Sequence, residues 1–477
     1  MVGPHRLPCE TPEAHAAFGR APAGTRWVLP ATILGSSLSF IDGSVVNVAL
    51  PAMQASLEAD LGTLQWVVNA YMLTLASLIL LGGSAGDRFG RRRVFIVGLL
   101  GFTAASLACA LAPSALWLIG ARTVQGAAAA LLTPTSLAIV GAAYSGDARG
   151  PAIGTWAAAA ALTTALGPPL GGWLVDTSGW RSIFFINLPI GMAALAFALK
   201  LPAERGSKHA PPLDRRGTLL AILCLGALCY GLIALGESKP VEGAIAIAAA
   251  VPLGLLFVRT EARASSPMMP LALFRDGDFS GANALTVLLY AALGGALFLL
   301  PFLLIQVHGY SALAAGAAFL PFSAIMGLGS RWSGGLVAQL GARLPLIVGP
   351  ALTAAGYVAL GFSGGNPSYW SGVLPGLLLV SIGMTIAVPP LTTTVLNAAP
   401  DENSGTASGI NNAAARTGSL LAVAALGLAV GGSATNLDAA ALLHAYRLTL
   451  WAAGVLAALG ALTAALTITP RDAQSRR

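Results

Sequence analysis

The chain has 477 residues, of which 56% are hydrophobic and 9% are charged, and its mean hydropathy is +0.76. This apolar composition excludes a soluble globular protein. The net charge of +7 does not indicate nucleic-acid binding, because the basic residues follow the pattern of a membrane topology. The four cysteines show neither metal-site nor disulfide spacing, and we interpret them as small apolar packing residues.

Fourteen long apolar stretches follow one another along the chain, and each is predicted to form a transmembrane helix. Strand-like alternation is absent from these stretches, so we expect an all-α polytopic membrane protein and not a barrel. The predicted helices lie near 27–50, 63–83, 94–112, 115–141, 150–175, 182–200, 217–236, 242–258, 280–304, 312–331, 345–363, 371–397, 405–430 and 447–468.

The basic residues predict the orientation of these helices. With the N-terminus in the cytoplasm, 21 Lys and Arg fall on the cytoplasmic side and 3 on the outer side. Such a bias is typical of membrane proteins, whose cytoplasmic loops are rich in Lys and Arg. The first 26 residues lack the short apolar core of a signal peptide. We therefore expect a multi-pass protein of the cytoplasmic membrane with both termini in the cytoplasm.

Two polar linkers and a weak internal repeat predict two similar halves. Residues 83–92 and 334–343 align with their glycines and final arginine in register. Repeated halves in transporters usually place the substrate site between them, near the membrane midplane. The predicted units are an N-terminal tail 1–26, a six-helix bundle 27–200, a linker 201–278 with two extra helices, a six-helix bundle 279–468 and a C-terminal tail 469–477.

Three ionisable side chains are predicted to lie within the bilayer: Asp42, Arg122 and Arg416. A charge near the bilayer centre costs about 2.5–3.5 kcal/mol on insertion scales, so such residues usually serve a function. Asp42 lies about 13 Å and Arg122 about 12 Å from the outer helix ends, at 1.5 Å per residue. Burial favours a neutral carboxylic acid and a nearby cation favours an ionised one. The two residues therefore predict a site that exchanges protons, with a permanent ion pair or a snorkelling Arg122 as the alternatives.

Four segments resemble motifs of the major facilitator superfamily, specifically its fourteen-helix drug:proton antiporter branch. The resemblance implies two six-helix bundles plus two extra central helices. It also implies export driven by the proton gradient, without a cofactor, a metal or an enzymatic reaction. The segments are 42–51 with Asp42, 122–126 with Arg122, the loop motif Gly83, Asp87, Arg88, Gly90, Arg91 and Arg92, and the antiporter motif Gly167, Pro168, Pro169, Gly171 and Gly172.

Each of these segments has a role that the resemblance implies. Asp42 and Arg122 would couple protons to transport, and the loop motif would gate the cytoplasmic side. In that gate Asp87 would contact the N-terminus of a neighbouring helix, and the arginines would tie helix ends together. The antiporter motif would kink its helix at the prolines and pack closely at the glycines. Thr163 stands where the branch has the leading glycine of this motif.

Several polar and aromatic residues are candidates for a substrate cavity, although each is also compatible with plain packing. No acid lies within the last six predicted helices, so we expect monovalent or neutral lipophilic substrates, including drugs or antibiotics, and not dications. The candidates are Asn69, Trp156, Tyr290, Phe298, Asn411 and Arg416.

Other functions fit the sequence less well. A membrane-embedded enzyme needs a catalytic constellation, and one embedded acid is too few. An ATP-driven pump needs a G-x-x-x-x-G-K-[ST] loop, and the chain has none. A facilitator for a native metabolite has the same fold and remains the alternative. The expected partners are a small-molecule substrate, protons and the lipid bilayer, with a periplasmic adaptor left open.

Overall fold

The computed structural model describes residues 25–145, 148–202, 212–400, 403–430 and 438–470. Within these ranges the regular elements are all helices, which confirms the predicted all-α class. The predicted tails 1–26 and 469–477 lie almost entirely outside the described residues. The first group of helices comprises η1 (Thr25–Trp27), α2 (Val28–Leu57), α3 (Leu61–Phe89), α4 (Arg91–Ala110), α5 (Ala115–Ala143), α6 (Arg149–Ser178), α7 (Ser182–Phe185) and α8 (Asn187–Ala198).

Two central helices and a second group follow. The central pair is α9 (Arg215–Gly236) and α10 (Pro240–Arg263). The second group comprises η3 (Leu271–Arg275), α11 (Gly277–Phe302), the π-helical turn η4 (Leu303–Val307), α12 (Ala312–Ala317), α13 (Leu320–Ser333), α14 (Leu336–Leu340), α15 (Arg343–Ser363), the π-helical turn η5 (Tyr369–Val373), α16 (Leu374–Asn397), α17 (Ser404–Val430) and α18 (Ala439–Thr467).

Thirteen described spans are long and apolar enough to cross a membrane, and the fourteenth predicted helix, at 182–200, corresponds to the shorter apolar stretch Ser182–Ala198, which is divided into α7 and α8. Pro189 lacks the N–H that would bond back to the carbonyl of Phe185, where α7 ends. Pro321 has the same relation to Ala317, where α12 ends and the chain turns into α13. Each division thus lies four residues before a proline.

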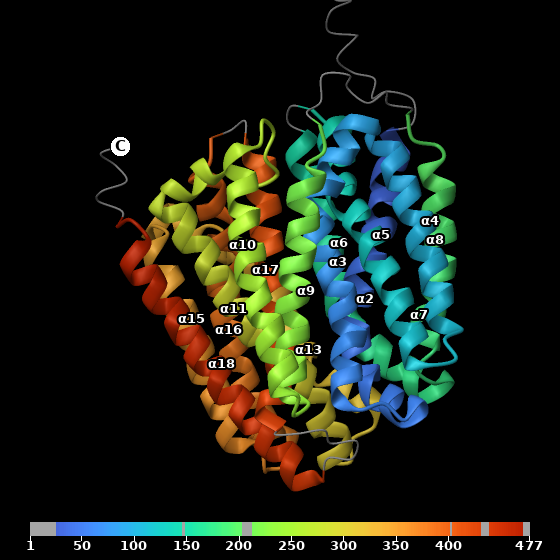
Figure 1. Cartoon of the computed structure of the whole chain (residues 1–477), viewed down its shortest axis with the longest axis vertical. Coiled ribbons are helices and arrows are strands. Elements are labelled where there is room, and N and C mark those ends of the chain that lie inside the picture. Colours follow the sequence, from blue (N-terminus) through green and yellow to red (C-terminus); the bar gives the residue numbers. More distant parts are fainter. Residues whose placement is uncertain (1–24, 146–147, 203–211, 401–402, 431–437, 471–477) are drawn as a thin grey trace, which may run out of the picture.

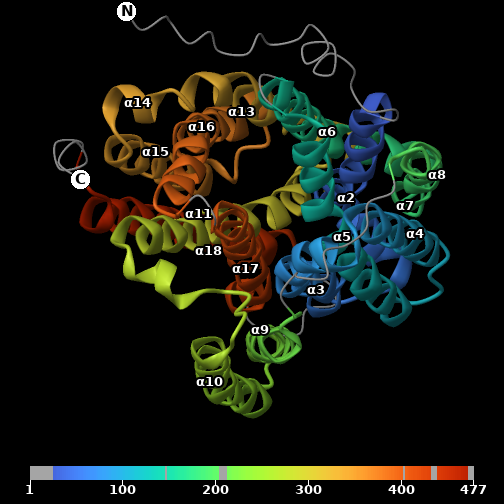
Figure 2. The same ribbon diagram turned by 90° about the horizontal axis from the view of Figure 1, so that it is seen from above.

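The helices form two bundles side by side. The first bundle, α2–α8, is blue to green in Figure 1, and the second, α11–α18, is yellow to red. The bundles meet where α3 packs on α17 and where α6 packs on α12 and α13. Figure 2 shows α9 and α10 outside this junction, and α9 packs on α3 and α17. The extra helices therefore lie beside the junction and do not separate the bundles.

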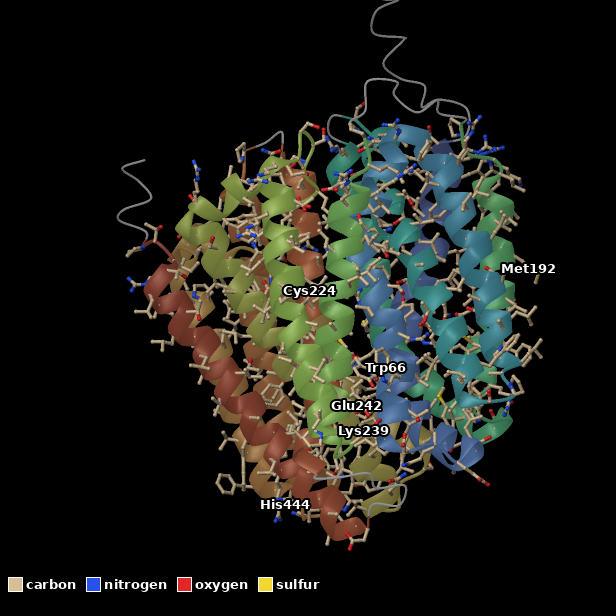
Figure 3. The ribbon with its side chains drawn as sticks, viewed as in Figure 1. Trp66, Met192, Cys224, Lys239, Glu242 and His444 are labelled. Carbon is tan, nitrogen blue, oxygen red and sulfur yellow. The ribbon has the colours of Figure 1, made fainter. Side chains whose placement is uncertain are left out.

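The two ends of the molecule differ in charge. Arg88 lies in the last turn of α3 and Arg91–Arg93 lie in the first turn of α4. The helices α9 and α15 begin with arginines at the same end, which we call the arginine-rich face. The other end, the opposite face, includes Lys239, Glu242 and His444 (Figure 3). Between the faces the outer surface is apolar: Met192 on α8 is 63% exposed and Leu328 on α13 is 83% exposed. Such side chains are suited to contact with lipid.

Candidate functional site

The centre of the first bundle contains a buried ion pair. Asp42 on α2 and Arg122 on α5 are 0% and 1% exposed, and the Nη1 atom of Arg122 lies 2.5 Å from the Oδ2 atom of Asp42. One turn along α5, Gln125 Nε2 donates to the other carboxylate oxygen at 3.0 Å. The structure thus brings together the two embedded residues that the sequence placed at similar depth on separate helices.

Arg122 has further partners besides the carboxylate. Its Nε atom donates to the carbonyl of Val67 at 3.2 Å, and Nη1 donates to Gln125 Oε1 at 2.7 Å. The guanidinium also lies over the ring of Tyr71, 4.2 Å from the ring centroid. Amide, carbonyl and aromatic groups all stabilise a guanidinium. The arginine would therefore keep partners even if Asp42 lost its charge.

The local sequence of α5 makes this contact with α3 possible. Arg122, Gln125 and Gly126 share one helix face, as their i, i+3, i+4 spacing predicts. A Cβ atom on Gly126 would overlap the backbone carbonyl of Tyr71. Glycine is therefore required here for α5 to approach α3 closely enough for Arg122 to reach Val67.

A cavity of about 160 Å³ lies between the two bundles, next to the ion pair. We call it the central cavity. The hydroxyl of Ser39 in its wall lies 3.0 Å from the hydroxyl of Tyr71, whose ring contacts Arg122. Tyr71 thus connects the cavity wall to the ion pair, and no feature of the sequence singled it out. The lining residues are Ser39, Phe40, Gly43, Ser44, Asn47, Val48, Thr164, Pro168, Leu297, Phe319 and Arg416.

The residues predicted to line a cavity have different positions. Arg416 on α17 lines the central cavity. Trp156 on α6 is absent from the lining, and its Nε1 atom donates to Ser36 Oγ on α2 at 3.1 Å. Asn411 joins α17 to α11 by donating to Thr286 Oγ1 at 2.7 Å. Trp156 and Asn411 are therefore placed as packing contacts between helices.

The remaining three candidates also lie away from the lining. Phe298 is fully buried in the apolar core and stacks on Phe302, which corrects its predicted place in the cavity. The main-chain carbonyl of Tyr290 accepts a bond from Ser419 Oγ at 3.0 Å. Asn69 is fully buried, and its amide has no hydrogen-bond partner among the described residues.

The antiporter motif lies where α6 meets both α2 and the second bundle. Gly167 and Gly171 face α2, and a Cβ atom on either would overlap α2 side chains. Gly172 faces α12, and its Cβ atom would overlap the carbonyl of Ala312. Pro168 lines the central cavity. The motif therefore packs α6 against both of its partner helices beside the cavity.

Asp176, which the sequence did not single out, extends this contact to the opposite face. The carboxylate of Asp176 accepts bonds from the backbone N–H groups of Ala312 and Leu313 at 3.1 and 2.8 Å, so it caps α12 of the other bundle. Asp176 follows Gly172 by one helical turn and faces the same way. This i, i+4 spacing beyond the glycine motif was the signal that could have identified it.

The loop motif lies on the arginine-rich face and ties helices together. Arg92 donates from Nε to the carbonyl of Ala198 at 3.3 Å and from Nη2 to that of Leu199 at 2.6 Å, at the end of α8. Asp87 accepts bonds from Arg91 at 3.0 and 3.2 Å. The described partner of Asp87 is therefore an arginine one turn away, and not the helix N-terminus that the resemblance implied.

The same arrangement recurs in the second bundle, at the positions that the repeat aligns. Gly90 and Gly341 both have positive φ, of 96° and 76°, which favours glycine. Two residues further on, Arg343 Nη2 donates to the carbonyl of Ala465 at 2.6 Å, near the end of α18. Arg92 and Arg343 thus each hold the last helix of their own bundle, as cations near helix C-termini commonly do.

Two repeated helical bundles around a cavity, with apolar outer surfaces, define a membrane transporter architecture. A family model described as the Major Facilitator Superfamily matches residues 32–423. Multidrug resistance protein Stp of Mycobacterium tuberculosis is 40% identical over 403 residues, covering 84% of this chain and 74% of that protein. Methylenomycin A resistance protein of Bacillus subtilis is 37% identical over 415 residues, covering 86% and 88%.

The chain therefore belongs to the major facilitator superfamily, and it is a transporter and not an enzyme. A solved structure of a POT family transporter in complex with 5-aminolevulinic acid has a TM-score of 0.69, is 13% identical and covers 92% of this chain and 95% of that one. That likeness is one of fold alone.

Proposed function

We propose that this transporter is a proton-coupled antiporter that exports small lipophilic compounds across the cytoplasmic membrane by alternating access. The buried pair of Asp42 and Arg122 is the observation on which this proposal rests. The names of the relatives support the direction of transport, since they describe multidrug resistance and methylenomycin A resistance. The proton gradient is the energy source in this proposal, and no cofactor takes part.

Asp42 is suited to alternate between its ionised and protonated forms. In a site without exposure to solvent, Arg122 neutralises the ionised carboxylate and Gln125 donates a hydrogen bond to it. Protonation would remove one partner of Arg122, but Val67, Gln125 and Tyr71 would still hold the guanidinium. The change of charge therefore alters the attraction between α2 and α5 without leaving Arg122 unpartnered in a region of low dielectric.

The proposed orientation places the arginine-rich face in the cytoplasm, in keeping with the positive-inside rule. The opposite face is then external. There Asp176 caps α12 across the junction, and Gln306 Nε2 donates to Gln54 Oε1 at 2.9 Å between the bundles. These contacts support a conformation closed toward the outside, from which alternating access requires the bundles to separate at that face.

Asp42→Asn tests the coupling. The amide keeps the size of the side chain but cannot exchange a proton, so we expect uncoupler-sensitive efflux against a gradient to be lost. Accumulation of a fluorescent lipophilic dye is measured in proteoliposomes with an imposed pH gradient. Glu58→Gln, at the exposed end of the same helix, is the control and should transport normally. Gradient-driven efflux by Asp42→Asn at the wild-type rate, with equal protein level, would refute proton coupling at this site.

A further inference from the structure

We infer that the central cavity recognises a lipophilic substrate with one negative charge, such as a carboxylate or an ionised phenol, and that Arg416 is the residue that binds this charge. The inference rests on the proposed export function and names its substrate class. The sequence predicted monovalent or neutral lipophilic substrates, with Asp42 as the only embedded acid, and the inference assigns a negative sign to that single charge.

The first observation concerns the charge of the cavity wall. Its described lining contains one ionisable side chain, Arg416, together with hydroxyl, amide and apolar groups. Asp42 follows Phe40 and Ile41 on α2 but is absent from the lining, because its carboxylate faces Arg122 and Gln125 and is 0% exposed. A cation in the cavity would therefore meet a like charge and no free carboxylate, whereas an anion would meet a guanidinium.

The second observation concerns the contacts of Arg416 with the described residues. Within the described ranges the guanidinium makes no hydrogen bond or ion pair, although the side chain is partly buried in a helix interface. Three arginines that pack between helices have acceptors instead: Arg92 and Arg343 bind helix carbonyls, and Arg122 binds a carboxylate. A partly buried charge is stabilised by a counter-charge nearby. A substrate carboxylate would supply two acceptors in the geometry that a guanidinium fork matches.

The third observation concerns the rest of the pocket. Asn47, Ser44 and Thr164 offer neutral polar groups on the first bundle, while Leu297 and Phe319 offer an apolar surface on the second. Pockets that bind drug-sized ligands commonly combine an apolar lining with a few polar groups that fix orientation. The cavity thus fits a small aromatic or aliphatic body with an acidic group directed at α17.

Three matched probes separate the charge classes: naphthylacetate, its methyl ester and naphthylmethyl-trimethylammonium. Binding to the purified full chain is measured by naphthyl fluorescence. We expect the anion to bind about tenfold tighter than the ester, and the cation weakest, because a charge-assisted pair exceeds a neutral contact. Arg416→Gln should remove the preference for the anion while ester affinity changes less than about twofold. Arg416→Lys should keep part of the preference, and Arg259→Gln, an exposed arginine on α10, should keep all of it.

The wild-type order of the three probes tests the inference even if the Arg416 variants fail to fold. Equal or tighter binding of the cation, or an unchanged preference for the anion in folded Arg416→Gln, would overturn it. The charge that moves during transport gives a second test. Exchange of one inward proton for one exported anion moves a net two positive charges inward. The same exchange moves one positive charge for the neutral ester and none for the cation. If the ester is exported in an uncoupler-sensitive manner but the anion is not preferred, only this inference is refuted. If the anion binds through Arg416 but its transport does not depend on protons, only the proposed coupling is refuted.

Discussion

The two faces of the molecule use their polar residues differently. At the opposite face, Asp176 and the Gln54–Gln306 pair connect one bundle to the other. At the arginine-rich face, the contacts of Arg92 and Arg343 stay within their own bundles. The first kind of contact must break when the bundles separate at that face, whereas the second can persist through such a motion. Under the proposed alternating access, the opposite face would therefore control the equilibrium between conformations, and the arginine-rich face would maintain each bundle as a rigid unit.

The largest effect is expected from filling the close contact between α6 and α12. A Cβ atom on Gly172 would overlap the carbonyl of Ala312, so Gly172→Ala should disfavour closure of the opposite face about tenfold or more. Gly154→Ala is the matched control, because a Cβ atom on Gly154 of the same helix has nothing within 4 Å. Spin labels at Glu58 and Ser368, in a background without native cysteines, report the distance between the bundles at this face. An unchanged distance distribution in Gly172→Ala would contradict the proposed role of this contact.

Removal of the cap across the junction should have the next largest effect. Asp176→Ala leaves the N–H groups of Ala312 and Leu313 without their acceptor, and a lost helix cap costs about 0.5–2 kcal/mol. Because Asp176 is exposed and water can replace it in part, we expect about a fivefold shift toward separation at the opposite face. The same spin-label distances measure the shift.

Asp438→Ala is the control for this cap. Asp438 caps its own helix, α18, through the N–H of Ala441 at the same face, so its loss should lower stability without changing the distance between the bundles. Equal shifts in the two variants would show that the effect of Asp176 is one of helix stability and not of contact across the junction.

The contact of Asp176 illustrates what the sequence could and could not predict. Hydropathy placed the helices well, because membrane spanning depends on local composition, and depth along the helices suggested that Asp42 and Arg122 meet. The repeat also placed Arg92 and Arg343 in register, and the structure gives them equivalent contacts. Asp176 was missed because its partner is the backbone of a distant helix: its i, i+4 spacing from Gly172 indicates the helix face that the two residues share, but not the helix that this face contacts. Phe298 was misplaced because composition does not show which face of a fully apolar helix points to a cavity.

A smaller effect is expected from the ties within the bundles. Arg92→Gln and Arg343→Gln each remove bonds to the carbonyls at the end of the last helix of one bundle. Each should lower the melting temperature by a few degrees while leaving the distance between the bundles at the opposite face unchanged. The two variants serve as controls for each other, since the repeat predicts similar losses. A large change in that distance with normal melting would contradict their assignment to bundle rigidity.

The smallest effect on stability is expected from Asp87→Asn. Asp87 is exposed and pairs with Arg91 within one turn, and exposed pairs of this kind contribute about 0–1 kcal/mol. Melting and substrate affinity should therefore stay near the wild-type values. The variant also releases Arg91, which donates from Nη1 to the carbonyl of Ala138 on α5, so the turn can change its contacts. We expect transport to slow about twofold to threefold, which corresponds to an increase of about half a kcal/mol in the activation free energy of the conformational change. The single-turnover rate reports the transfer of bound substrate across the membrane, and the steady-state rate also includes the return of the empty transporter. A large loss of substrate affinity with normal turnover would place Asp87 in substrate binding. It would then contradict the assignment of the arginine-rich face to bundle rigidity.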